Sequence, residues 1–430
     1  MSDLLIEKGR VIDPASSTDH IADVLIREGR IVEIGHAIEV ASRDTLRCID
    51  ATNCIVAPGL VDLAAEFREP GHESDETMAS GSAAALAGGY TTVLCCSSTD
   101  PKMDSAASVQ LVRQLADDVN GVRVHPIACL SKQRRGEQMA ELGILAQAGA
   151  VAFSDSPRPM PNDALLKRAL DYCRMFDLPI FDRPEVPGLA EGGVMHNGCV
   201  GLRLGLRGLP TEAEDLAVAR DVRLAEATSG RLHIGPVSTM GAIDMIGRVK
   251  ERGIQITASV CPHNLTGSDV DLCSFDSRFK VHPPLRSPRH VDAVRQALAA
   301  GVIDAVESGH MPRAWEKKSN DLDQAPFGAA TLETTLSIMV TDLINPGELS
   351  WSRAIECLST APATIAGING GRLQVGQPAD VVVINPSATW TVNADQFASQ
   401  CRSSPADGRT LTGRATHTIV GGHVKFSRQP

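Results

Sequence analysis

The sequence predicts an α/β fold, a (β/α)8 TIM barrel with a small β domain assembled from the two ends of the chain. Two observations predict it: apolar β-like runs alternate with helical patterns through the middle of the chain, and β-rich segments separated by turns occupy both ends. Strands that alternate with helices pair in parallel through crossover connections. Eight such units over roughly 300 residues fit a closed barrel.

The two ends of the chain carry short predicted strands. Asp13-Pro14 and Glu28-Gly29 mark turns near the N-terminus, and Gly421-Gly422 predicts a hairpin near the C-terminus. The strands are predicted at residues 4–6, 10–12, 22–27, 30–34, 381–384, 389–392, 418–420 and 423–426. We expect residues 1–56 and 370–430 to form one composite β-sandwich, beside a barrel of residues 57–369.

The middle of the chain supplies the eight β/α units. Its strands are predicted at residues 55–63, 91–96, 122–128, 150–154, 178–181, 232–234, 254–260 and 302–306. Its helices are predicted at residues 73–87, 103–118, 135–148, 161–176, 211–228, 239–252, 290–300 and 329–345. An open doubly wound sheet is the alternative, but the chain lacks the glycine-rich phosphate-binding fingerprint that such sheets carry.

The composition is that of a globular protein, with 43% hydrophobic and 22% charged residues. A formal net charge of -11 argues against non-specific binding to nucleic acid or to an anionic membrane. No apolar run approaches the roughly 20 residues that a membrane-spanning helix needs, and the N-terminus lacks the pattern of a signal peptide. The 11 cysteines include no C-x-x-C pair, so we expect free thiols in the cytoplasm.

The first barrel strand leads into a motif that resembles the dihydroorotases of the amidohydrolase superfamily. Pro58-Gly59-Leu60-Val61-Asp62 and the segment from Ala64 to Gly71 resemble that family's PG-hydrophobic-hydrophobic-D followed by H-x-H-x-R-x-P-G. Further similarities follow in the family's order at residues 88–93, 152–155, 237–239, 283–286, 370–373 and 376–380. The resemblance therefore covers almost the whole chain and implies the same barrel.

The resemblance also implies a centre of one or two zinc ions, and the positions that should hold it are changed. The H-x-H positions are Ala64 and Glu66, the histidine after the fifth strand is Arg183, the histidine after the sixth is Pro236, and the aspartate of D-H-A-P-H is Gly309. Of the expected ligands, only Asp155 after the fourth strand survives. Methyl groups and guanidinium groups offer no lone pair to a metal. We therefore predict no metal site, no cofactor and no catalytic residue.

The substrate side of the implied site is only partly kept. Arg68 matches the arginine that grips the substrate carboxylate in the family, whereas its asparagine partner falls on Ser98 and a second asparagine position carries His282. An anion pocket can persist on Arg68, but the full recognition set cannot.

Two open questions concern the charged and imidazole groups at this end of the barrel. Glu66 could pair with Arg68, or it could pair with Arg183 and fill the vacated metal position with a carboxylate–guanidinium bridge, which is our hypothesis. His233, His263 and His282, together with His310, follow predicted strands. We expect hydrogen-bond partners for these rings rather than a new metal site.

These changes predict that the chain is not a hydrolase but a pseudoenzyme. Because dihydroorotases of this branch associate with aspartate carbamoyltransferase, the resemblance implies a non-catalytic subunit that supports assembly of that enzyme's catalytic chain in de novo pyrimidine synthesis, within a homo- and hetero-oligomer. One alternative is a hydrolase of the cyclic-amide type with an altered or metal-free site. Another is a small-molecule sensor that keeps Arg68 as an anion clamp.

Overall fold

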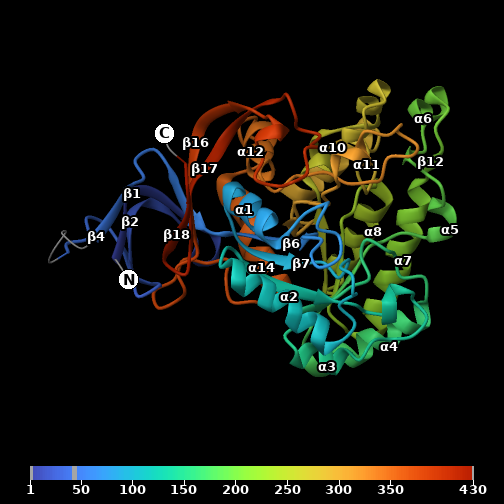
Figure 1. Ribbon diagram of the computed structural model, residues 1–430, viewed down its shortest axis with the longest axis horizontal. Coiled ribbons are helices and arrows are strands. Elements are labelled where there is room, and N and C mark those ends of the chain that lie inside the picture. Colours follow the sequence, from blue (N-terminus) through green and yellow to red (C-terminus); the bar gives the residue numbers. More distant parts are fainter. Residues whose placement is uncertain (1–2, 41–45, 429–430) are drawn as a thin grey trace.

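The structure is a computed structural model that describes residues 3–40 and 46–428; residues 1, 2, 41–45, 429 and 430 of the predicted β-rich ends lie outside that part of the chain. It consists of a barrel and a separate sheet domain built from the two ends, which lie side by side in Figure 1. No helix of the described residues is long and apolar enough to cross a membrane.

The predicted barrel is confirmed, with eight parallel strands in chain order around it. They are β6 (Leu60–Ala65), β7 (Tyr90–Cys95), β8 (Arg123–Ala128), β9 (Ala152–Phe153), β10 (Ile180–Asp182), β13 (Leu232–Ile234), β14 (Ile256–Val260) and β15 (Ala305–Val306). The first and last strands meet through hydrogen bonds: the N–H of Glu66 donates to the carbonyl of His310 at 3.0 Å, and the N–H of Ser308 donates to Asp62 at 2.7 Å.

Four of the outer helices, α1, α2, α4 and α8, begin where a side chain accepts a hydrogen bond from a free N–H group of the first turn. Ser105 accepts from the N–H of Ser108 at the start of α2, and Thr239 accepts from that of Ala242 at the start of α8, each at 3.2 Å. The outer helices are α1 (Met78–Gly88), α2 (Ala106–Val119), α3 (Leu142–Gln147), α4 (Asp163–Cys173), α7 (Thr211–Thr228), α8 (Met240–Glu251), α10 (Pro288–Ala299) and α12 (Thr335–Met339), which continues as a π-helix over Val340–Ile344.

Several short elements lie at the ends of the barrel and were not expected. Between β10 and α7 the chain makes an excursion that projects beside the barrel in Figure 1. It comprises α5 (Pro187–Ala190), β11 (Met195–His196), α6 (Cys199–Leu204) and β12 (Gly208–Leu209). The other short helices are α9 (Pro262–Thr266), α11 (Trp315–Lys318), α13 (Trp351–Ile355) and α14 (Ala361–Ala366).

The sheet domain joins strands from both ends of the chain in the order β18-β17-β16-β5-β1-β2-β3, with β4 paired to β1. Its strands are β1 (Asp3–Asp13), β2 (Thr18–Arg27), β3 (Arg30–Gly35), β4 (Leu46–Asp50), β5 (Ile55–Pro58), β16 (Val381–Thr391), β17 (Thr410–Val420) and β18 (His423–Ser427). Strand β1 covers both predicted strands 4–6 and 10–12. Its pairing with β2 shifts register between Ile6 and Gly9, but the strand continues through the shift.

The boundary between the two parts falls within one predicted strand, at Gly59 between β5 and β6. A side chain there would lie 2.1 Å from the Thr91 side chain, so only glycine fits. The carboxylate of Asp380 also ties the parts together, accepting from Arg123 Nε at 2.9 Å and from the N–H of Gly421 at 2.7 Å. The barrel is thereby held with its first strand against the sheet domain.

Candidate functional site

A pocket opens at the C-terminal ends of the barrel strands, where barrel enzymes carry their chemistry. It encloses about 560 Å³, counting its open mouth. Five of the eight positions singled out from the sequence line it: Ala64, Glu66, Arg183, Pro236 and Gly309. Arg68 reaches it through Glu66, while Ser98 and Asp155 are buried but are not among the lining residues.

Ala64 and Glu66 both face the pocket, as the two-residue period of strand β6 predicts. Glu66 forms a buried ion pair with Arg68, and the two side chains are 3% and 4% exposed. Neither Glu66 oxygen accepts a hydrogen bond of good geometry, and Nε and Nη2 of Arg68 donate none. Among the described residues the partner of Glu66 is therefore Arg68, and the hypothesised Glu66–Arg183 bridge is wrong.

Arg183 is held by a different pair of residues. One of its Nη atoms donates to Nδ1 of His282, and Nε2 of that ring donates to Glu185 at 2.8 Å. Burial, together with the Arg183 charge, lowers the pKa of His282 to about 4, so the ring is neutral and can accept. Arg183 itself is 4% exposed, and its Nε has no partner.

Asp155 faces away from the pocket, because it alternates with Ser154 and Ser156, which line it. Its carboxylate accepts from the N–H groups of Leu130 and Ser131 at 2.9 and 3.0 Å, and from the Ser131 hydroxyl. Burial raises the pKa of Asp155. The one apparent survivor of the expected ligands thus anchors a loop. That loop also explains why α3 begins at Leu142 and not near residue 135 as predicted.

Ser98 occupies the position of the family's asparagine partner of Arg68, and its hydroxyl is buried with no hydrogen-bond partner among the described residues. Burial lowers the pKa values of two further guanidinium groups, those of Arg134 and Arg313, and the charge of nearby Glu66 opposes that shift at both. Carboxylates lie beside these two cations as well, since Asp155 acts on Arg134 and Asp75 on Arg313.

Three of the four histidines have hydrogen-bond or ion-pair partners, as expected. His233 contacts Thr257 and Ser259 at 2.9 and 3.0 Å, and burial lowers its pKa to about 3. His310 accepts from the N–H of Thr331 at 3.2 Å and lies 3.4 Å from Glu76. His282 is held by Arg183 and Glu185. His263 differs, since both ring nitrogens are buried and without a partner.

Two pocket residues were missed at the sequence level, Cys261 and Glu307. They follow the adjacent strands β14 and β15, and the Cys261 thiol donates to Glu307 Oε1 at 3.8 Å. Burial and the nearby Asp62 raise the pKa of Glu307 to about 7. Because acids at the C-terminal ends of barrel strands lie at the active-site face, the position of Glu307 after an apolar run could have identified it.

The residues present do not fit a zinc site. Zinc in enzymes takes about three imidazole, thiolate or carboxylate ligands and keeps one open position. Ala64, Pro236 and Gly309 offer no such donor, and Arg183 brings a positive charge to the same place. Among residues 3–40 and 46–428, no three His, Cys, Asp or Glu side chains are arranged to hold a metal ion.

Comparison with known proteins places the chain in a family. Two family models match it, one described as dihydro-orotase-like over residues 53–241 and one as the amidohydrolase family over residues 199–425. Dihydroorotases of Anaeromyxobacter dehalogenans and Solibacter usitatus are 44% and 40% identical to it, over 99% of this chain and 98% of theirs. The chain belongs to the dihydroorotase-like amidohydrolases.

This dihydroorotase-like chain has a more similar relative in Rhodopirellula baltica, a protein named "Putative dihydroorotase" that is 70% identical over 99% of this chain and 93% of its own length. Among solved structures, L-hydantoinase (dihydropyrimidinase) from Arthrobacter aurescens superposes with a TM-score of 0.90 at 24% identity, over 100% of this chain and 97% of that one. A D-hydantoinase gives 0.84, also at 24%, over 99% and 95%. These two likenesses establish the fold.

The relatives overturn the prediction that the chain is a pseudoenzyme and not a hydrolase. Full-length relatives at 40% to 70% identity carry the name of an enzyme, and nothing in the comparisons marks this branch as inactive. The prediction failed because it equated the loss of zinc ligands with the loss of catalysis. A buried cation and a buried carboxyl group in the same pocket can also act on an amide.

Proposed function

We propose that the chain interconverts a cyclic amide of the dihydroorotate type and its open ureido acid, which in pyrimidine synthesis is ring closure, with its own side chains in place of a metal. The names of the full-length relatives support the substrate class. The pocket at the C-terminal mouth of the barrel supports the location. The reaction adds water across a ring amide and releases a ureido dicarboxylate.

The observation that carries the proposal is Nε of Arg183, a buried donor in the pocket wall that has no hydrogen-bond partner among the described residues. An unpaired buried donor costs about 1 to 3 kcal/mol, so it marks a place where a ligand atom completes the site. A guanidinium aimed at an amide carbonyl stabilises the oxyanion that forms during hydrolysis. His282 and Glu185 hold that guanidinium in position.

The substrate carboxylate has a binding group on the other side of the pocket. Nε of Arg68 is buried and has no hydrogen-bond partner among the described residues, while its Nη2 forms the ion pair with Glu66. A planar guanidinium binds a carboxylate in a bidentate manner, which fixes the orientation of the ring. Arg68 and Arg183 would thus hold the two charged or polarised ends of one small cyclic acid.

The test is turnover by the untagged full chain in both directions, ring opening of dihydroorotate and ring closure of carbamoyl-aspartate, before and after treatment with a chelator. We expect turnover that chelation does not remove. Absence of turnover in both directions would overturn the proposal. Turnover lost on chelation and restored by zinc would overturn the metal-free part and place ligands outside the pocket described above.

We also propose that the chain assembles with the catalytic chain of aspartate carbamoyltransferase. Exposed apolar side chains support this, since Leu202 on α6 is 85% exposed and Phe275, which follows the 3-10 helix Asp269–Ser274 packed against α6, is 52% exposed. Exposed apolar groups of this kind mark protein contacts. Co-purification tests it: L202D and F275D should weaken assembly, whereas L216D, at a 55% exposed position on α7, should not. Failure of the two chains to associate would contradict it.

A further inference from the structure

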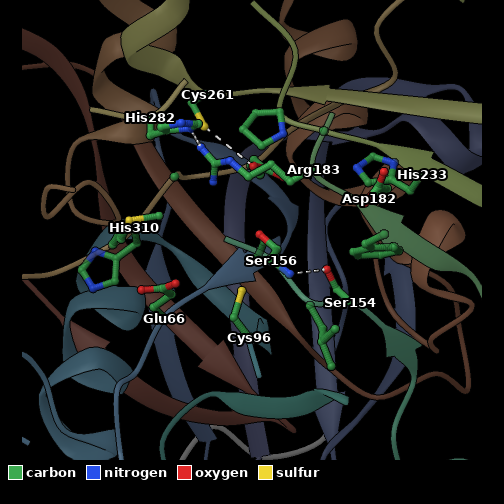
Figure 2. A pocket seen from close by; sticks show the side chains of 18 residues that line it. Glu66, Cys96, Ser154, Ser156, Asp182, Arg183, His233, Cys261, His282 and His310 are labelled. Atoms are coloured by element: carbon green, nitrogen blue, oxygen red, sulfur yellow. Dashed lines mark hydrogen bonds between the residues drawn. The ribbon is translucent and has the colours of Figure 1, made fainter. Parts of the chain in front are cut away.

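Beyond the zinc-ligand positions, the pocket holds a thiol, a carboxyl group and a guanidinium on one wall. We infer that Cys261 is the nucleophile of this pocket, with Glu307 as its general base and Arg183 as the group that stabilises the oxyanion. The inference rests on the proposed function, because it names the groups that would open the ring amide. Figure 2 shows Cys261, Arg183 and His282 together on this wall, with Glu66 and Cys96 farther along the pocket.

Strand register brings the thiol and the carboxyl group together. Strands β14 and β15 pair Ser259 with Ala305 and Val260 with Val306, so the next residues of the two strands, Cys261 and Glu307, emerge side by side at the pocket floor. The Cys261 Sγ lies 3.8 Å from Glu307 Oε1 and donates to it. Both residues are buried, at 0% and 4% exposure, which excludes bulk water from the contact.

The other oxygen of Glu307 is already committed, which leaves Oε1 for the thiol. The Ser259 hydroxyl donates to Oε2 at 2.9 Å, and His233 Nε2 lies 3.0 Å behind that hydroxyl. These contacts fix the carboxyl plane, as a positioned base requires. Ser259 and His233 are therefore positioning residues and not catalytic residues.

Arg183 gives an independent indication that a ligand belongs here. It is 4% exposed, it lines the same pocket, and its Nε has no partner. Its charge acts on both Cys261 and Glu307, lowering the pKa of each against the effect of burial. A substrate carbonyl placed between Sγ and Nε would supply the missing acceptor and present its carbon to the thiol.

The reaction balances with these groups and water alone. The sulfur attacks the ring carbonyl carbon, the thiol proton passes to Glu307 Oε1, and the carbonyl oxygen becomes an oxyanion beside Arg183. The C–N bond then breaks, the ring nitrogen takes the proton from Glu307, and a thioester remains on Cys261. Water attacks the thioester and gives its proton to Glu307, and the departing sulfur takes that proton back.

The protonation states agree with this order of events. Burial and the Glu307 charge raise the pKa of Cys261 well above its ordinary value, so the resting group is a thiol and needs a base at the moment of attack. The groups that face Glu307 are Asp62, which with burial raises its pKa, and Ser259, Arg183 and Cys261, which lower it. With a pKa of about 7, Glu307 can both take and return a proton near neutral pH.

The first test is kinetic. We expect C261A and E307Q each to lower kcat by about 100-fold or more, the usual contribution of a nucleophile or a positioned base. The matched control is C129A, since Cys129 is equally buried but does not line the pocket. Full activity in C261A would overturn the inference while leaving the proposed function standing, with water as the direct nucleophile.

The second test detects the thioester. Wild-type protein mixed with dihydroorotate and quenched in acid should gain the full mass of one substrate molecule, because ring opening releases no fragment, and peptide mapping should place it on Cys261. The adduct should be absent from C261A. An active enzyme that never accumulates the adduct, even when a slowly hydrolysed cyclic imide replaces the substrate, would count against a covalent route.

A third measurement separates this inference from the proposed function if the wild type shows no turnover. Methyl methanethiosulfonate, a small thiol reagent, should modify Cys261 faster than Cys129 at pH 8, and E307Q should slow the reaction at Cys261 alone. Equal rates at the two thiols, unchanged by E307Q, would overturn the inference whatever the activity. Peptide mass spectrometry gives the rate at each cysteine.

Discussion

Two buried glutamates, Glu214 on α7 and Glu66 after β6, have the same exposure of 3% and opposite surroundings. Glu214 accepts from the N–H groups of Ser238 and Thr239 at 2.6 and 2.8 Å, and Arg286 lies 3.4 Å away. Glu66 has the ion pair with Arg68, and neither of its oxygens accepts a well-aligned hydrogen bond. The Glu214 carboxylate has well-aligned hydrogen bonds from the chain, whereas the Glu66 carboxylate has none.

The difference separates buried charges that stabilise the fold from buried charges that belong to the binding site. Buried polar groups of a stable framework are satisfied by the chain itself. Among the described residues, buried polar atoms without a hydrogen-bond partner include those of Glu66, Arg68 and Ser98 and, elsewhere in the pocket wall, Nε of Arg183. Polar groups left incomplete at one mouth of a barrel indicate that a ligand completes them. Five variants test that distinction.

The largest effect is expected from Glu214, whose carboxylate has hydrogen-bond partners within the chain, and it is an effect on stability. E214Q should lower the free energy of unfolding by about 3 kcal/mol or more, because a neutral amide cannot serve two backbone donors and the Arg286 charge together. E66Q should cost less than E214Q, because Glu66 serves one partner, Arg68, whereas Glu214 serves two backbone N–H groups and Arg286. Urea unfolding measures both. Equal losses would show that Glu66 is as much a part of the framework as Glu214.

The next effect concerns the incomplete site. R183M should lower kcat/KM by about 100-fold to 1,000-fold, the range for removing one oxyanion-stabilising donor. It should lower the free energy of unfolding by only about 1 kcal/mol, because the one hydrogen bond lost is that from Nη to His282. R135M, at an exposed position, is the control. Unimpaired turnover in R183M would remove Arg183 from the mechanism.

A smaller effect is expected from the charge of Glu307. Burial raises its pKa from the ordinary 4.5 to about 7 in the folded protein. Between these values the folded state keeps a proton that the unfolded state has lost, so stability falls as the pH rises and the loss is complete above pH 7. E307Q should therefore be about 2 to 3 kcal/mol more stable than wild type at pH 8 and nearly equal at pH 4. An equal difference at both pH values would contradict the raised pKa.

The smallest effect is predicted for Asp155. D155N should lower stability by about 1 to 2 kcal/mol, because the carboxylate accepts from Leu130 and Ser131. It should leave turnover nearly unchanged, since the side chain does not line the pocket. A large loss of activity without a change in the unfolding midpoint would return Asp155 to the site.

The sequence predicted the barrel and the positions of its eight strands, because side-chain periodicity and burial act locally along the chain. It also located Ala64, Glu66, Arg183, Pro236 and Gly309 at one mouth, since barrel strands end on the same face. The sequence did not predict which residue each charged group of the pocket pairs with. Arg183 pairs with His282, 99 residues away, and no local signal distinguishes that partner from Glu66.

The sequence by itself determined which donors the pocket lacks: side-chain chemistry is a property of each residue, and no fold gives an alanine or a proline a lone pair for zinc. Only the tertiary structure decided what the remaining groups do. Strand pleat turned Asp155 away from the pocket, and strand register set Cys261 against Glu307. Burial then raised the pKa of that carboxyl group, because a charge is costly wherever the surrounding chain excludes water.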